Sequence, residues 1–190
     1  MDNKNIMLTS PNSVKAVSYI NNNVTDDVIG ASIREAGDIH LQSIIGTALY
    51  RRLQELVNNK IQGVNDNIDS EENEAYKFLL DEYVEPYLIS KVQFLICQPI
   101  SYKVRNMGVI QNSDANVNKS TSDEIGKLAN RFNTEAMRRA TALSMYLCKN
   151  KSAYPELTSS CDCNDVKPML GRRFVNVPIN LGGSHGDCCC

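Results

Sequence analysis

The sequence predicts an all-α protein, a helical bundle of about four to five helices with an extended N-terminal arm and a long extended C-terminal tail. Two observations lead to this prediction. Apolar residues recur at intervals of three and four through most of residues 25–155, as they do on the buried face of a helix. The same periodicity is missing before residue 25 and after residue 155. We therefore divide the chain into an N-terminal arm (1–24), a helical bundle domain (25–155) and a C-terminal tail (156–190).

Size and composition fit one such domain. A chain of 190 residues can bury one sizeable core, and 42% apolar with 22% charged residues is ordinary for a soluble globular protein. The net charge of -2 gives no overall attraction to nucleic acid or to an anionic membrane. No apolar run approaches the roughly 20 residues that span a bilayer, and the N-terminus lacks a signal-peptide core and a lipidation motif. We expect a protein that is made and kept in the cytoplasm.

Local residue patterns mark the boundary between the N-terminal arm and the helical bundle. Residues 1–24 mix polar and apolar side chains around Pro11, a pattern that favours an extended arm or short strand over a helix. Thr25 then offers an N-cap, and Asp26 and Asp27 suit the positive end of a helix. The first helix of the bundle is expected to begin there.

Residues 38–60, DIHLQSIIGTALYRRLQELVNNK, predict a helix, a glycine stop and a second helix. Gly46 can adopt a left-handed conformation and end the first helix, and Thr47 is available as the N-cap of the second. Gly46 and Thr47 should thus form a tight structural corner. His40 is expected to be a structural or surface side chain, because no second histidine or carboxylate lies at ligand spacing on its face.

A polar loop follows Lys60, and Ser70 can cap the next helix. The apolar face of that helix continues to near Val104, and Pro86 either kinks it or begins a second helix. Residues 106–120 are rich in Asn and Ser and are predicted to be a second long loop.

The last helix is expected to open at Thr121 or Ser122 and to run to about Lys151. Its apolar stripe is predicted to comprise Ile125, Leu128, Ala129, Phe132, Ala136, Ala140, Leu143 and Leu147. From Glu156 the composition changes, with prolines, glycines and no helical period. A tail of this kind cannot bury itself alone, so it either packs back along its own domain or adds to a neighbouring protein.

Motifs for catalysis are lacking. The sequence contains no P-loop, GxGxxG, HExxH or ExxH pattern, and its only histidines are His40 and His185. We expect no enzyme activity, no catalytic residues and no cofactor.

The seven cysteines need separate interpretations. Cys97 and Cys148 fall in predicted helices and are expected to be small buried side chains. The other five lie in the tail and could bind a soft metal, but their spacing is unlike that of known zinc sites, so no metal site is predicted. Oxidation of exposed thiols is favoured over metal binding, and the role of these five stays open; they are Cys161, Cys163, Cys188, Cys189 and Cys190.

The order of elements, with the stretches IIGTALYRRLQELV and LLDEYVEPYLISKVQFLI, resembles the head-to-tail connector, or adaptor, proteins of tailed phages over roughly residues 25–150. It is most similar to the adaptor ring protein of crAss-like phages. The resemblance implies a virion protein, made in the host bacterial cytoplasm, that forms a homo-oligomeric ring at the portal vertex and joins it to the tail. The ring is commonly twelve-fold and continues the DNA ejection channel.

The resemblance also implies partners. They are further copies of the chain, the portal protein, other tail or ring proteins, and passing genomic DNA without sequence-specific binding; no membrane is involved. Family members use their termini for such contacts, so the apolar residues of the tail become the candidate protein-interaction anchor: Phe174, Val175, Val177, Ile179 and Leu181.

Two alternatives remain. One is a small helical regulatory or partner-binding protein that acts as a monomer or dimer through its C-terminal tail. The other is a metal-dependent or redox protein that uses the tail cysteines. A large ring favours the connector, a discrete dimer favours the regulator, and stoichiometric zinc favours the third interpretation.

Overall fold

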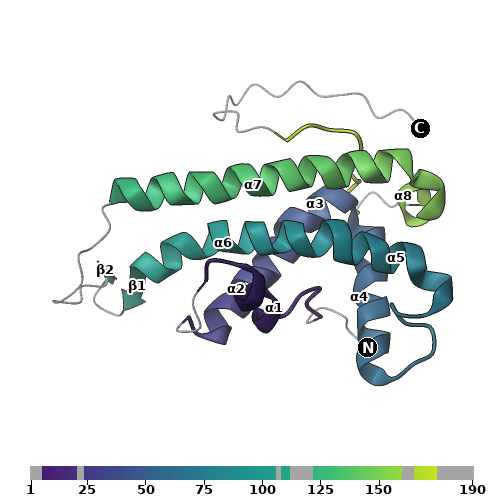
Figure 1. The fold of residues 1–190 in the computed structure, drawn as a ribbon, viewed down its shortest axis with the longest axis horizontal. Helices are drawn as coiled ribbons and strands as arrows, with labels where there is room; N and C mark the ends of the chain where they lie inside the picture. The colour runs from purple at the N-terminus through teal and green to yellow at the C-terminus, as the bar shows by residue number, and fades with distance from the viewer. Residues whose placement is uncertain (1–5, 21–23, 106–107, 112–121, 160–164, 175–190) are drawn as a thin grey trace.

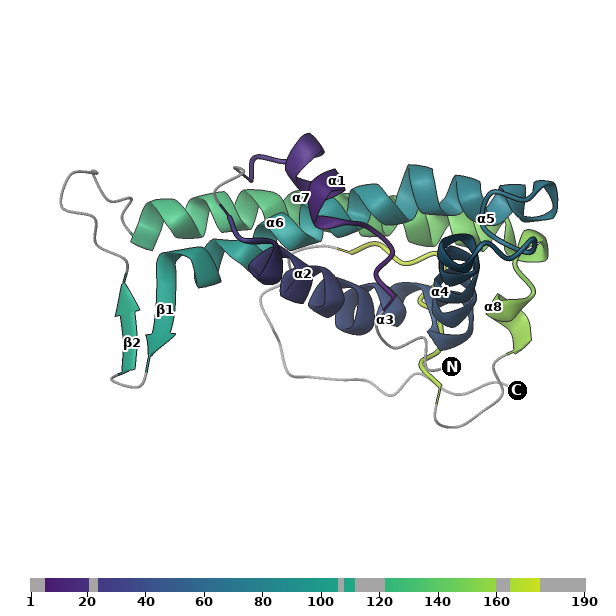
Figure 2. The same ribbon diagram turned by 90° about the horizontal axis from the view of Figure 1, so that it is seen from below.

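The computed structural model describes residues 6–20, 24–105, 108–111, 122–159 and 165–174. Within these ranges the protein is helical apart from one small hairpin, so the predicted all-α bundle is confirmed. Its centre is a pair of long antiparallel helices, α6 and α7, which lie side by side along their length (Figure 1). Helices α1, α2 and α3 pack beside this pair, and α4 and α8 lie near one end of it (Figure 2).

The first helical rod of the bundle consists of α2 (Asp26–Glu35), a π-helical segment (Ala36–Leu41) and α3 (Gln42–Ile45). Thr25 is its N-cap residue, as predicted, although its side chain makes no capping hydrogen bond. The rod ends at Gly46, and α4 (Thr47–Gln62) leaves in a new direction until Gly63 ends it in the left-handed conformation. The predicted corner is therefore present.

The second rod begins with a 3-10 turn (Glu71–Asn73) and continues through α5 (Glu74–Leu79), a π-helical segment (Leu80–Val84) and α6 (Glu85–Ser101). Pro86 is the second residue of α6 and follows the π-helical segment directly, so the rod continues through the proline.

A β-hairpin follows the second rod, which the sequence did not lead us to expect. Strands β1 (Tyr102–Arg105) and β2 (Gly108–Gln111) pair antiparallel, with Lys103 opposite Ile110. The predicted loop at 106–120 is thus wrong for 108–111. The rest of that loop, residues 106–107 and 112–120, lies outside the described residues.

The last long helix, α7 (Ser122–Lys149), begins where it was predicted and ends two residues short of Lys151. A 3-10 turn (Lys151–Ala153) and the short helix α8 (Glu156–Ser159) follow it. Most of the predicted stripe is buried, but Leu128 is exposed near the free end of the helix.

The N-terminal arm also contains a helix, α1 (Pro11–Val17), where extended structure was favoured. Pro11 is the reason: it occupies the first turn of the helix, and Ser10 caps that turn by accepting a hydrogen bond from the Ser13 N–H. Val14 is fully buried, so the arm is anchored to the bundle.

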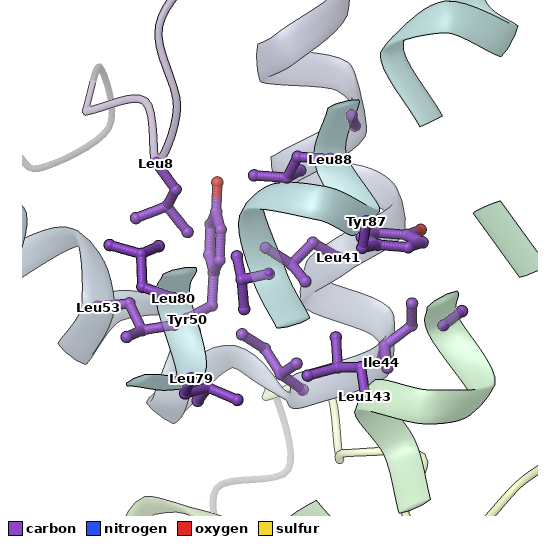
Figure 3. Close-up of a cluster of buried hydrophobic side chains, with 14 of the residues drawn as sticks. Leu8, Leu41, Ile44, Tyr50, Leu53, Leu79, Leu80, Tyr87, Leu88 and Leu143 are labelled. Atoms are coloured by element: carbon purple, nitrogen blue, oxygen red, sulfur yellow. The ribbon is translucent and has the colours of Figure 1, made fainter. Parts of the chain in front are cut away.

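The core joins all of these elements. Figure 3 shows Leu8 of the arm beside Tyr50 of α4, with leucines of the second rod around them. Tyr154, which follows α7, is fully buried, and its hydroxyl donates to the Ala75 carbonyl oxygen at 2.9 Å. Among the described residues, no helix is both long and apolar enough to cross a membrane.

Candidate functional site

The corner is built around a glycine that no other residue replaces easily. Gly46 has φ 83° and ψ 159°, a backbone conformation that is nearly exclusive to glycine. A Cβ atom at this position would lie 2.9 Å from Pro168 Cδ and 3.2 Å from the Val166 carbonyl oxygen. Gly46 is thus needed for its positive φ, as predicted, and also because a segment of the tail passes directly against it.

Thr47 does not act as the predicted N-cap. Gly46 occupies the N-cap position, and the Thr47 hydroxyl turns to the tail, where it accepts hydrogen bonds from the Val166 N–H (3.0 Å) and the Gln42 amide (2.9 Å). The Thr47 N–H in turn donates to the Val166 carbonyl oxygen at 3.0 Å. Because the first N–H groups of a helix lack partners within it, Thr47 is free to bond with another segment.

We call residues 165–174 the strap, because they run from the corner along α7 (Figure 2). The Met169 N–H donates to the Ile44 carbonyl oxygen at 2.9 Å. Farther along, the fully buried Ser144 donates its hydroxyl proton to the Met169 carbonyl oxygen and accepts from the Arg172 N–H. The tail was expected either to pack along its own domain or to add to a neighbouring protein, and residues 165–174 pack along their own domain.

Phe174, the first residue of the predicted anchor, is half-buried at the end of the strap. Its N–H donates to the Thr141 hydroxyl at 3.0 Å, and its side chain packs against the core. The other four anchor residues, Val175, Val177, Ile179 and Leu181, lie outside the described residues. Their role between proteins stays a prediction.

A groove of about 390 Å³ lies between α1, α6 and α7. Tyr19 and Val17 stand exposed at its rim, and the Tyr19 ring lies 6.1 Å from that of Phe132, centroid to centroid. On one wall, the buried Gln93 Oε1 has no hydrogen-bond partner among the described residues. Sequence patterns did not identify this groove, because its walls come from three separate segments.

A second cavity, of about 170 Å³, lies on the other side of α7, where the first rod, α6 and Phe174 meet. Its polar lining includes His40, Tyr87 and Lys91. Burial and the nearby Lys91 lower the pKa of His40 to about 4, and burial lowers the pKa of Lys91 as well. His40 is thus half-buried and neutral at pH 7.

The described cysteines differ from their prediction. Cys148 is exposed, so the expectation of a buried side chain is wrong for it; at this turn of α7 the fully buried residue is its neighbour Leu147. Cys97 is half-buried and its thiol donates to the Gln93 carbonyl oxygen. The tail cysteines and His185 lie outside the described residues, and the part of the chain that is described holds no group of three metal-ligating side chains.

Two arginines, Arg52 and Arg139, form ion pairs with carboxylates of the same chain. Arg52 pairs with Glu55 at 2.9 Å and with Asp66 at 3.3 Å, and Arg139 pairs with Glu135 at 3.0 Å. Ion pairs at the surface such as these contribute little to stability.

Comparison with known proteins gives one match. No curated protein and no solved structure matches the chain significantly. Residues 41–167, from the end of the first rod through the corner and both long helices to the start of the strap, match a family of unknown function, DUF6712. Because the match covers more than half of the chain, this protein belongs to the DUF6712 family.

Proposed function

We propose that this protein is a head-to-tail connector subunit of a tailed phage, which assembles with its own copies into a ring between the portal and the tail. The ring would continue the DNA channel and would bind DNA without sequence specificity. The resemblance of the two quoted stretches motivates this assignment. One feature of the fold supports it: apolar side chains are exposed on two separate faces.

The first face, which we call face A, lies where the arm meets the first half of α7 and carries Tyr19 and Leu128. The second, face B, lies at the end of α4 and carries Ile61 and Val64. In Figure 1 the first half of α7 is at the left and the end of α4 is at the lower right. A ring needs two such faces, because each subunit uses one surface toward one neighbour and a different surface toward the other.

The first experiment measures the mass of the purified chain by light scattering behind a sizing column, alone and mixed with the portal protein encoded near it. A species of about twelve subunits, alone or only with portal, is the expected result. A stable monomer or dimer that ignores the portal overturns the proposal and favours the regulatory alternative.

A pair of variants then tests the two faces. Tyr19→Ser with Leu128→Ser should disable face A, and Ile61→Ser with Val64→Ser should disable face B. Each variant alone should fail to form a ring. A mixture of the two should stop at a heterodimer, because only one pair of intact faces remains.

Ile39→Ser, a change at another exposed apolar residue, is the matched control and should leave the ring intact. If the mixture behaves like either variant alone, faces A and B do not meet. Circular dichroism of each variant checks that the helical fold is kept.

A further inference from the structure

The cavity beside Phe174 has walls that are mostly apolar. Its apolar lining residues are Ile44 of α3, Ala136, Met137 and Ala140 of α7, and Phe174. An apolar cavity of this size is ordinarily either filled by a side chain or left dry. This one differs because polar side chains also line it: His40 and Ser43 of the first rod, Tyr87 and Lys91 of the second rod, and Asn133 of α7. Three of them, His40, Tyr87 and Lys91, carry the argument below.

The first polar group is the hydroxyl of Tyr87. The residue is only 4% exposed, and in Figure 3 its ring points away from the cluster of leucines toward α7. The hydroxyl lines the cavity and makes no hydrogen bond to any residue that the structure describes. The hydroxyl is therefore available to donate a hydrogen bond to a ligand in the cavity.

The other two groups are the Lys91 ammonium, one turn along α6, and the His40 imidazole of the first rod. Each loses hydration on burial, and the pKa of each is lowered. Glu35, at the end of α2, is the carboxylate that acts on Lys91, but the two form no ion pair within the described part of the chain. Within the described part of the chain the Lys91 ammonium has no bonded carboxylate, and it lies over the Phe94 ring, 4.6 Å from the ring centroid.

We propose that this cavity binds a carboxylate group, held by the Lys91 ammonium and the Tyr87 hydroxyl, with His40 at its side. A carboxylate is a monoanion and matches the single positive charge. Its two oxygens accept hydrogen bonds from both donors, and its carbon chain suits the apolar walls. A nucleic-acid backbone fits less well, because phosphates are usually bound by several cations on an open surface. This inference is independent of the connector proposal.

The test follows the His40 imidazole by NMR in the full-length chain, with His185→Gln used to assign the signal. Acetate is the probe, sodium chloride at equal ionic strength is the control, and inorganic phosphate is the competing anion. Acetate should raise the pKa of His40 and saturate, since a bound anion favours the charged imidazolium. An equal shift with chloride, or a larger one with phosphate, overturns the proposal.

Two variants locate the binding. Lys91→Gln should weaken acetate binding at least about tenfold, because a charge-assisted hydrogen bond contributes about 1.5–3 kcal/mol. Tyr87→Phe, which keeps the ring, should weaken it less but measurably. Lys127→Gln, at an exposed lysine of α7, is the matched control and should change nothing. If Lys91→Gln and Lys127→Gln bind acetate equally while both keep their melting temperature, the site is not here.

A third set of binding measurements distinguishes an acidic side chain of a partner protein from a small free carboxylate. A blocked Val-Glu-Val tripeptide and its Val-Gln-Val counterpart are compared with acetate. Tighter binding of the glutamate peptide alone supports an acidic side chain of a partner protein as the natural ligand. Acetate binding without any gain from the peptide supports a small free carboxylate. Equal binding of the two peptides shows that the carboxylate is not what the cavity recognises.

Discussion

Replacing Gly46 with alanine should release the strap from the corner. Two costs meet at this position. An alanine held at φ 83° and ψ 159° is strained by about 1–3 kcal/mol. Its Cβ would also lie 2.9 Å from Pro168 Cδ and 3.1 Å from the Pro168 nitrogen, which is closer than such atoms approach. The chain can relieve the contact only by moving the corner or the strap.

Moving the strap breaks the three hydrogen bonds that join it to the corner, two at Thr47 and one at Ile44. Each contributes about 0.5–1.5 kcal/mol. Because releasing the strap limits the cost of the clash, we expect Gly46→Ala to lower the free energy of unfolding by about 2–4 kcal/mol in total. Urea unfolding followed by circular dichroism measures this, and hydrogen exchange should show faster exchange at the Thr47 and Met169 amides.

Gly63 provides the matched control. It ends α4 with φ 70°, and a Cβ there would meet nothing within 4 Å. Gly63→Ala should therefore cost only the backbone penalty, about 1 kcal/mol, and should leave the Thr47 and Met169 amides protected. Deleting residues 166–190 should reduce the cost of Gly46→Ala to its backbone part. Equal costs for both glycines, with or without the strap, would refute the reasoning.

Three further predictions rest on single contacts. A Cβ on Gly37 would lie 2.6 Å from the Tyr50 hydroxyl oxygen, so Gly37→Ala should cost about 1–3 kcal/mol in urea unfolding, and much of that loss should disappear in the Tyr50→Phe background. Burial and the Glu156 carboxylate raise the pKa of Tyr76 from 10.0 to about 12. The contribution of Tyr76 to stability is therefore complete below pH 10 and is lost as the pH rises toward 12. Tyr76→Phe should make the melting temperature less dependent on pH in that range. The pKa of His40 is lowered from 6.5 to about 4. The contribution of His40 to stability is therefore complete above pH 6.5 and is lost as the pH falls toward 4. The melting temperature of His40→Gln should depend less on pH between 6.5 and 4.

The helices were predictable because their signals are local. Thr25 with two aspartates marks a start, Gly46 marks a stop, and the stripe of α7 repeats over many turns. The two elements that the sequence did not predict, α1 and the hairpin, depend on where a few residues stand within a short segment. A proline such as Pro11 usually interrupts a helix, but directly after the N-cap residue Ser10 it begins one. The hairpin at 102–111 was hidden because its few β-branched residues adjoin a long Asn-rich stretch.

The strap and the cavity could not be derived from spacing. The strap is held by single hydroxyls at Thr47, Thr141 and Ser144, and one polar residue in an apolar helix has no periodic signature. The cavity unites His40 with Tyr87 and Lys91 only because the two rods pack against each other. The sequence spacing of a single histidine and a single lysine in separate helices does not predict that they line the same cavity.

The strap also has a consequence for the order in which the protein folds. Its bond between Val166 and Thr47 joins positions 119 residues apart, whereas the corner forms from neighbouring turns. Closing so long a loop is costly before the rods have packed, so we expect the strap to dock after the rate-limiting step of folding. Changes in the strap should then speed unfolding while leaving the folding rate nearly unaltered. On this expectation the strap sets how quickly the folded protein unfolds, and the helices set how quickly it folds.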